Sequence, residues 1–421
     1  MAEESAGPGA HERALHPELV RGLLEAIDEN AREPESAYEA EALLRDALRE
    51  GASDIHLDAG LEGILVRVRV DGTLLDAARL EQSQGQRVGN QLRTLARLDP
   101  LAAVTPAEGW GSYVVEDQEV GLRISVVPTL HGDKLAVRLI EAAQITRQLE
   151  ELGLAEDDRE CVHQWVQDAG GMLVAAGQTG SGKTTTLYAL LERFRREERQ
   201  VVTLEDPVEY GIPGINQIQV DRRHGLDFPN GVRSMLRLDP DLMLLGEIRD
   251  APSAEAAVDA AASGRALLTT LHARDAVGTV QVLKNLGLDA YQIGAYVRLI
   301  IAQRLVRTLC PQCREEGPPD RITVRWLESL GREVPERVWH PVGCEECSGV
   351  GYEGRTGIFE VWRLDDDDVG LLLESPSDRD LREHLRAKGH RFLQDEALRK
   401  AAAGVTTLEE LRNRNMVWMG R

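Results

Sequence analysis

The sequence predicts an α/β fold in which a parallel sheet carries the functional site and a smaller α+β domain precedes it. Three observations lead to this prediction. Between residues 54 and 140, alternating strands are separated by turns such as Asp71-Gly72, a good hairpin dipeptide. Beyond residue 154, apolar strands alternate with helical segments, as in a parallel sheet whose site lies at the carboxyl ends of its strands. Between residues 310 and 357, four cysteines stand in two close pairs.

The domain boundaries are expected where these patterns change. The amphipathic pattern of residues 17–51, with Gly51 as a stop, predicts short helices. A polar stretch, EAAQITRQLEELG, predicts a linker. The expected parts are a short helical N-terminal region (1–50), an α+β domain (51–141), a linker (142–153) and an α/β domain (154–421) that includes a cysteine-bearing subdomain (310–357) and a helical C-terminal part (376–421).

The composition argues against two classes of function. Lys and Arg number 49 and Asp and Glu number 71, so the formal net charge is −22. Such a surface repels nucleic acid, and no direct nucleic-acid partner is expected. No apolar run reaches the roughly 18–20 residues that a membrane span needs, and the polar N-terminus lacks the pattern of a secretory signal. We therefore expect a cytoplasmic protein that contacts a membrane only through partners.

A phosphate-binding loop is the strongest single motif. Residues 177–184, GQTGSGKT, match G-x-x-x-x-G-K-[ST] between an apolar strand and a helix. This context argues against a chance glycine turn. Backbone N–H groups of such a loop surround the phosphates, Lys183 reaches the β and γ oxygens, and Thr184 ligates magnesium. The predicted nucleotide-binding residues are Gly177, Gln178, Thr179, Gly180, Ser181, Gly182, Lys183, Thr184 and Thr185.

Charged side chains follow three other apolar strands. Glu205 ends the strand of TLEDPVEY, Glu247 follows MLLG, and His272 follows ALLTT. Strand ends beside a phosphate loop face the γ-phosphate, so these groups are expected to converge there. They could orient water and hold the water shell of magnesium, although each taken alone is also compatible with an ordinary loop residue. Gly246 stands where most P-loop ATPases have an aspartate.

The cysteine pairs predict a structural zinc site. CPQC supplies Cys310 and Cys313, and CEEC supplies Cys344 and Cys347, with thirty residues (314–343) between the pairs. Two C-x2-C knuckles form a four-thiolate tetrahedron, which suits zinc and leaves no open position for catalysis. The alternative is a set of redox thiols, which does not need paired knuckles.

Taken in order, the motifs resemble those of the type II secretion and type IV pilus assembly ATPases. The phosphate loop is followed by LEDPVEY, LRLDPDLMLLGEIRD, TTLHARDA, the cysteine pairs, GYEGRTGIFEV and GVTTLEEL. The resemblance spans about residues 51–415 and implies a RecA-like P-loop ATPase domain after a PAS-like domain. By this resemblance Gly246 is the family's usual residue and Glu247 is the Walker B carboxylate. Glu205 is then the partner for activating water, and His272 belongs to the histidine box, although sequence does not decide which glutamate is the base.

The same resemblance assigns four arginines to the γ-phosphate, partly across a subunit boundary: Arg123, Arg138, Arg233 and Arg237. Guanidinium is a fixed-charge, forked donor suited to phosphate, but strand-surface arginines are the alternative. Two departures from the family pattern are expected to matter. Arg265 replaces the first histidine of the histidine box, and the N-terminal docking domain is short or missing.

The resemblance implies a hexameric motor that uses ATP, Mg²⁺ and Zn²⁺. In the family, hydrolysis drives an inner-membrane platform protein that adds pilin or pseudopilin subunits, and a cytoplasmic docking protein is a further candidate partner. The cysteine pairs are typical of assembly and secretion motors, not of retraction motors. Two alternatives stay open at this point: a nucleic-acid or DNA-uptake motor, and a regulatory relative that binds ATP without hydrolysing it.

Overall fold

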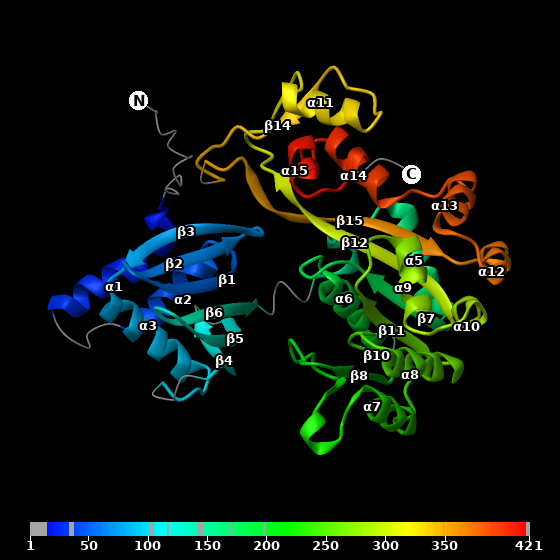
Figure 1. The fold of residues 1–421 in the computed structure, drawn as a ribbon, viewed down its shortest axis with the longest axis horizontal. Coiled ribbons are helices and arrows are strands. Elements are labelled where there is room, and N and C mark those ends of the chain that lie inside the picture. The colour runs from blue at the N-terminus through cyan, green and yellow to red at the C-terminus, as the bar shows by residue number, and fades with distance from the viewer. Residues whose placement is uncertain are drawn as a thin grey trace, which may run out of the picture. The chain divides into compact units, whose positions relative to one another are not determined.

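The computed structural model describes residues 15–32, 38–100, 105–115, 118–141, 147–168, 170–196, 199–347 and 349–417. The chain divides into two compact units, Met1–Ala142 and Ala143–Arg421 (Figure 1). Residues 1–14 of the expected N-terminal region, residues 142–146 of the expected linker and Ser348 of the cysteine-bearing subdomain lie outside the described residues.

Within the described part of the first unit, six antiparallel strands form one sheet in the order β3-β2-β1-β6-β5-β4. The predicted turn at Asp71-Gly72 joins β2 to β3, and both residues adopt the positive φ angles, 47° and 79°, that this dipeptide favours. The strands are β1 (Ala52–Gly60), β2 (Gly63–Val70), β3 (Thr73–Leu80), β4 (Ala107–Val115), β5 (Gln118–Thr129) and β6 (Gly132–Glu141).

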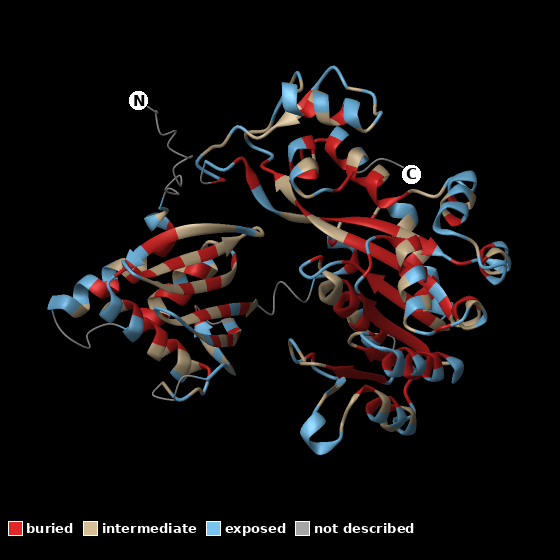
Figure 2. Ribbon diagram, viewed as in Figure 1, coloured by how far each residue is buried: buried red, intermediate tan, exposed pale blue. Residues whose placement is uncertain are grey.

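One face of this sheet is buried by helices. Along β1, Ile55 and Leu57 are buried while their neighbours are partly exposed, which is the alternation of a sheet covered on one side (Figure 2). The helical elements of this unit are η1 (Pro17–Val20), α1 (Arg21–Arg32), α2 (Glu39–Arg49) and α3 (Gln82–Leu95). Leu23 of α1 and Leu43 of α2 share one core with Ile55. The helices before Gly51 and the strands after it therefore form one compact unit.

In the second unit, the described strands form a seven-stranded sheet in the order β15-β12-β7-β11-β10-β8-β9. β12 and β15 pair in the antiparallel sense, and the other pairs are parallel. Strands such as LMLL at 242–245 are buried on both faces, as expected of a parallel sheet with helices on both sides (Figure 2). The strands are β7 (Gly171–Ala176), β8 (Val201–Glu205), β9 (Asn216–Gln219), β10 (Leu242–Leu245), β11 (Ala266–Leu271), β12 (Val297–Leu309) and β15 (Tyr352–Arg363).

Helices connect these strands and bury the sheet. Met172 and Val174 of β7 share a core with Val232 of α7, Ala257 of α8 and Val280 of α9. The helical elements of the unit are η2 (Leu149–Glu151), α5 (Glu156–Asp168), α6 (Lys183–Arg196), η3 (Arg222–His224), α7 (Phe228–Met235), η4 (Leu236–Leu238), α8 (Ala251–Ala262), α9 (Ala276–Asn285), α10 (Ala290–Tyr296), α11 (Arg321–Ser329), α12 (Asp366–Leu373), α13 (Asp378–Ala387), α14 (Leu393–Ala402) and α15 (Leu408–Asn413). Among the described residues, no helix has the length and apolar composition that a bilayer-spanning segment needs.

The cysteine-bearing insert packs with the C-terminal helices. Strand β14 (Val338–His340), which pairs with β13 (Glu315–Gly317), and helix α11 of this insert share a core with α14 and α15. The GVTTLEEL segment begins α15: Thr407 is the N-cap, and Glu410 pairs with Arg307 of β12 at 2.7 Å. This segment therefore fastens the C-terminal helices to the central sheet.

Candidate functional site

The phosphate loop joins the end of β7 to the start of α6, as the motif predicts. Its glycines at 177, 180 and 182 have φ angles of 158°, 75° and 89°. A Cβ at Gly177 would lie 2.4 Å from Ser181 Oγ and 2.6 Å from the Gln303 carbonyl oxygen, so the loop closes only around glycine. α6 begins at Lys183, directly after the loop glycines, and free N–H groups at a helix N-terminus are suited to binding phosphate.

Lys183 is the first residue of α6 and folds back over the loop. Its Nζ donates hydrogen bonds to the carbonyl oxygens of Gly177 at 2.8 Å and Gln178 at 3.1 Å. Burial lowers the pKa of Lys183, while the nearby carboxylates of Glu247 and Glu209 act in the opposite direction. The lysine therefore lies close enough to interact with two carboxylates, Glu247 after β10 and Glu209 after β8.

Glu209 is a site residue that sequence reasoning did not single out. The Thr184 hydroxyl donates to Glu209 Oε1 at 3.4 Å, and Thr184 is the residue predicted to ligate magnesium. Glu209 belongs to the same LEDPVEY motif as Glu205 and lies four residues after it. The LEDPVEY motif indicates that a glutamate contributes to the site, but it contains two glutamates and does not show which one reaches the phosphate loop.

The buried position of Glu205 does not suit the water-activating role predicted for it. Its side chain is 4% exposed. Its carboxylate accepts hydrogen bonds from the Tyr188 and Thr203 hydroxyls, both at 2.6 Å, and from Gln217 Nε2 at 3.2 Å. Burial and the adjacent Glu205 raise the pKa of Tyr188. The carboxylate of this motif that contacts the phosphate loop is therefore Glu209.

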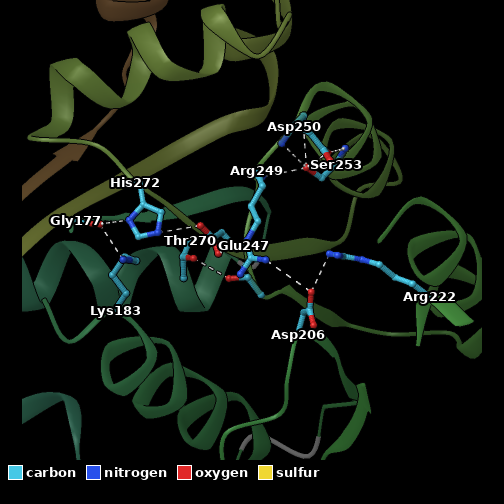
Figure 3. Close-up of polar contacts among 11 residues, drawn as sticks. Gly177, Lys183, Asp206, Arg222, Glu247, Arg249, Asp250, Ser253, Thr270 and His272 are labelled. Atoms are coloured by element: carbon cyan, nitrogen blue, oxygen red, sulfur yellow. Dashed lines mark hydrogen bonds and ion pairs between the residues drawn. The ribbon is translucent and has the colours of Figure 1, made fainter. Parts of the chain in front are cut away.

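His272 connects the phosphate loop with Glu247 (Figure 3). Its Nδ1 lies 3.1 Å from the Gly177 carbonyl oxygen, and its Nε2 lies 3.0 Å from Glu247 Oε1. The other oxygen of Glu247 accepts a hydrogen bond of 2.6 Å from Arg249 Nε. These contacts bring Lys183, His272 and Glu247 together at the carboxyl edge of the sheet, where the sequence predicts convergence.

The strand order explains this convergence. β11, which ends before His272, lies between β7 and β10, and β8 is the next strand after β10. The ends of four neighbouring parallel strands therefore carry the loop, His272, Glu247 and the Glu205–Glu209 segment. A Cβ at Gly246 would lie 3.3 Å from both Glu205 Cα and the Leu204 carbonyl oxygen, so the backbone of β8 leaves little room for an aspartate there.

Arg265 lies at the other end of β11. Its guanidinium donates to the Pro240 carbonyl oxygen at 2.8 Å and to Asp239 Oδ1 at 3.0 Å. The six-residue strand Ala266–Leu271 separates Arg265 from His272, which corresponds to roughly 20 Å of extended chain. This departure from the family pattern therefore does not touch the candidate site.

The four arginines predicted to act on phosphate make their described side-chain contacts with neighbouring residues of their own unit. Arg233 donates to Asn230 Oδ1 at 2.7 Å and Arg237 to Ser234 Oγ at 3.3 Å. In the first unit, Arg123 and Arg138 are direct cross-strand partners on β5 and β6. Arg123 pairs with Glu108 at 3.2 Å and Arg138 with Asp54 at 3.1 Å.

The four predicted cysteines form one cluster. The sulfur atoms of Cys310, Cys313, Cys344 and Cys347 all lie within 4.8 Å of one another. The sulfur–sulfur distances are 3.9 Å between Cys310 and Cys344, 3.8 Å between Cys313 and Cys347, and 3.7 Å between Cys344 and Cys347. Zn–S bonds of about 2.3 Å in a tetrahedron separate the sulfurs by roughly 3.8 Å. The cluster therefore fits a four-thiolate zinc site.

Backbone groups around the cluster favour thiolates. Burial raises the pKa of the Cys347 thiol, but N–H groups of Cys344 and Gly351 donate to its sulfur and lower the pKa to about 6. Burial raises the pKa of Cys313 to about 11, although the Gly343 N–H also donates to that sulfur. Such N–H···S contacts orient the ligands of zinc knuckles.

The sequence model of the family described as "Type II/IV secretion system protein" matches residues 32–413, which is most of the chain. The chain belongs to the type II/IV secretion system protein family. The family resemblance predicted from the motifs is thereby confirmed.

Two curated relatives show how far the similarity to this family extends. Type II secretion system protein E of Pseudomonas aeruginosa is 37% identical over 370 residues, which cover 88% of this chain and 73% of that protein. The type IV pilus assembly ATPase PilB of Thermus thermophilus is 35% identical over 370 residues, which cover 88% of this chain and 42% of that protein.

Two solved structures share the fold. The ATPase DotB of Legionella pneumophila aligns with a TM-score of 0.66 at 20% identity, covering 89% of this chain and 94% of DotB. The pilus retraction motor PilT aligns with a TM-score of 0.62 at 21% identity, covering 90% of this chain and 97% of PilT. The predicted α/β fold class is confirmed by these structures.

Proposed function

We propose that this member of the type II/IV secretion system protein family is a hexameric, cytoplasmic motor ATPase. It drives the assembly of pilin or pseudopilin subunits through an inner-membrane platform protein and reaches the membrane only through such partners. The names of its relatives, type II secretion system protein E and a type IV pilus assembly ATPase, support this assignment. A cytoplasmic docking protein of the same machine is a further proposed partner.

The observation that carries the proposal is the convergence at one sheet edge. Lys183 and Thr184 begin α6, His272 joins the loop carbonyl of Gly177 to Glu247, and Glu209 contacts Thr184. A fixed set of cationic, hydroxyl and carboxylate groups at the end of a P-loop sheet is what phosphoryl transfer to water requires. The family membership places the chain among ATP hydrolases.

Each group of the site has a proposed role. Residues 177–185 hold the phosphates of ATP, with Lys183 on the β and γ oxygens. Thr184 would hold magnesium, with Glu247 on its water shell, and the metal would neutralise charge on the phosphates. Glu209, which lies at Thr184, orients the attacking water in preference to the buried Glu205. His272 holds the Glu247 carboxylate in position relative to the phosphate loop.

The arginines of this proposal neutralise charge that develops on the γ-phosphate. Arg123, Arg138, Arg233 and Arg237 act in part on the site of a neighbouring subunit, which makes hydrolysis depend on assembly. Their described partners, such as Glu108 and Asp54, are exposed or partly exposed carboxylates. Surface ion pairs of this kind are worth about 0–1 kcal/mol and are readily exchanged for phosphate.

The cysteine cluster is proposed to hold zinc in a structural role. Four sulfur ligands leave no open coordination position. The insert shares its core with α14 and α15, so zinc would stabilise the attachment of the C-terminal helices and take no part in hydrolysis.

Phosphate release by the purified, metal-replete protein tests the proposal. We expect turnover per chain to rise with protein concentration as subunits associate. Glu247→Gln should lower turnover about 100-fold or more at saturating ATP, because it removes a charge that acts on the reacting groups. Equal turnover of wild type and Glu247→Gln would contradict the assigned site, and stimulation by nucleic acid would favour a nucleic-acid motor instead.

A further inference from the structure

We infer that Tyr188, Thr203, Glu205 and Gln217 form a positioning network, centred on the buried Glu205, that fixes the loop carrying Glu209 against the phosphate-loop helix. We call this set the Glu205 network. The inference rests on the proposed function, because it concerns how the carboxylate assigned to water activation is held. It gives Glu205 a positioning role in place of a catalytic one.

The centre of the network is a buried carboxylate whose described hydrogen-bond donors are all neutral. Glu205 Oε2 accepts from the Tyr188 hydroxyl at 2.6 Å, and Oε1 accepts from Thr203 at 2.6 Å and from Gln217 at 3.2 Å. A buried carboxylate needs such donors to offset its lost hydration. With its oxygens used in this way, Glu205 is an anchor and not a group that meets water.

Gln217 connects Glu205 to the backbone of the loop that carries Glu209. Its Nε2 also donates to the Tyr210 carbonyl oxygen at 2.9 Å, and its Oε1 accepts from the Ile212 N–H at 2.6 Å. Both contacts hold backbone within three residues of Glu209. On the other side of Glu209, the Val208 N–H donates to Gln219 Oε1 at 3.3 Å. The loop is thus tied to β9 before and after Glu209.

Tyr188 extends the network to the phosphate-loop helix. It lies on α6 four residues after Thr184, which is one helical turn on the same side of the helix. Tyr188 is 2% exposed, and its hydroxyl also lies 3.5 Å from Gln217 Nε2. The network therefore fixes the two segments whose side chains meet in the Thr184–Glu209 contact. A displacement of about 1 Å at a reacting group can cost 100-fold in rate.

Two substitutions remove the network while leaving Glu209 in place. Tyr188→Phe deletes one hydroxyl and keeps the ring, and Gln217→Met keeps the length of the side chain and removes its hydrogen bonds. Gln281→Met is the matched control, because Gln281 is an exposed residue of α9 away from this loop. For each purified protein we would measure steady-state phosphate release, the affinity for a fluorescent ATP analogue and the melting temperature.

We expect Tyr188→Phe and Gln217→Met to lower kcat by about 10- to 100-fold, with nucleotide affinity changed less than about threefold and with the control unchanged. The decisive measurement is the double variant with Glu209→Gln. If the network acts through Glu209, adding Gln217→Met to Glu209→Gln should lower kcat by less than about twofold further. A general structural effect would instead multiply the two losses.

The outcomes separate this inference from the proposed function. Wild-type kcat in Gln217→Met and Tyr188→Phe, together with a large loss in Glu209→Gln, would overturn the network and leave Glu209 in its role. Multiplying losses in the double variant would overturn it as well. Wild-type turnover in Glu209→Gln would instead remove Glu209 from the mechanism. Variants that no longer bind nucleotide and have a lowered melting temperature would also contradict the inference, because a positioning role leaves nucleotide binding intact.

Discussion

The imidazole of His272 lies between two hydrogen-bond acceptors, with the Gly177 carbonyl oxygen 3.1 Å from Nδ1 and Glu247 Oε1 3.0 Å from Nε2. Lys183 Nζ donates to the same Gly177 carbonyl oxygen at 2.8 Å. This oxygen therefore links the phosphate loop to His272 at the end of β11, and His272 in turn links the loop to Glu247 after β10.

His272→Ala should therefore lower kcat at saturating ATP by about 10- to 100-fold, because Glu247 loses its link to the phosphate loop. The side chain of His272 is 51% exposed, so its removal should leave the fold intact. Steady-state phosphate release measures the loss, and the melting temperature serves as the control. Wild-type kcat in this variant would show that the bridge is not used in turnover.

Arg265→His introduces the histidine that the family pattern has just before β11. We expect this substitution to give no gain in ATPase activity. Arg265 contacts Pro240 and Asp239 at the end of the strand opposite His272. Phosphate release should stay within about twofold of wild type, and the stability should fall by about 1 kcal/mol through the lost hydrogen bonds. A change in kcat of tenfold or more would show that this end of the sheet is coupled to hydrolysis.

Gly246→Ala should destabilise the fold by about 1–2 kcal/mol. The added methyl group would meet Glu205 Cα and the Leu204 carbonyl oxygen at 3.3 Å, and β8 cannot move away because β9 and β10 flank it. Gly211→Ala is the matched control, since no heavy atom lies within 4 Å of a Cβ at that position. Urea unfolding compares the two, and equal stability of both variants would refute the packing argument.

Zinc content tests the cysteine cluster. We expect about one zinc ion per chain in the wild type and a large loss of metal in Cys310→Ser, because Cys310 is one of the four ligands. Removing the metal with a chelator should raise hydrogen exchange in α14 and α15, which share a core with the insert. Cys161→Ser is the control, since Cys161 lies on α5 outside the cluster. Unchanged metal content in Cys310→Ser would contradict the site.

Lys400 should make the free energy of unfolding depend on pH in the alkaline range. Its Nζ donates to the Gly153 carbonyl oxygen at 2.6 Å and to the Gly357 carbonyl oxygen at 2.5 Å, and burial lowers its pKa from 10.5 to about 8. Between these two values the unfolded chain binds a proton that the native state does not bind. The free energy of unfolding therefore rises with pH across this window and does not depend on this group below it. The neutral amine still has two N–H donors for the two carbonyls.

The difference in free energy of unfolding between wild type and Lys400→Met isolates this effect from other groups that titrate at the same pH. It should grow in favour of the wild type when urea unfolding is measured at about pH 9.5 instead of about pH 7.5. A difference that is the same at both pH values would show that Lys400 is not held neutral by burial.

Features encoded by close spacing along the chain were predicted from the sequence. The phosphate loop and the hairpin at Asp71-Gly72 depend on residues within a few positions of one another, and each is found where it was expected. Each C-x2-C knuckle brings its own two cysteines close together, and the fold brings the two knuckles into one cluster. Local backbone geometry decides the arrangement in the loop, in the hairpin and within each knuckle.

The direction of a side chain on a buried strand was not predictable in this way. Val201–Glu205 is buried along its whole length, so the sequence pattern does not distinguish the two faces of β8. Only the pairing of β8 with β9 and β10 sends Glu205 toward Tyr188 and leaves Glu209 to meet Thr184. Likewise, only the strand order places β11 between β7 and β10. The order of residues along the chain sets which groups are available at the strand ends. Sheet order and burial set which of these groups meet, because such contacts join segments that are far apart in the sequence.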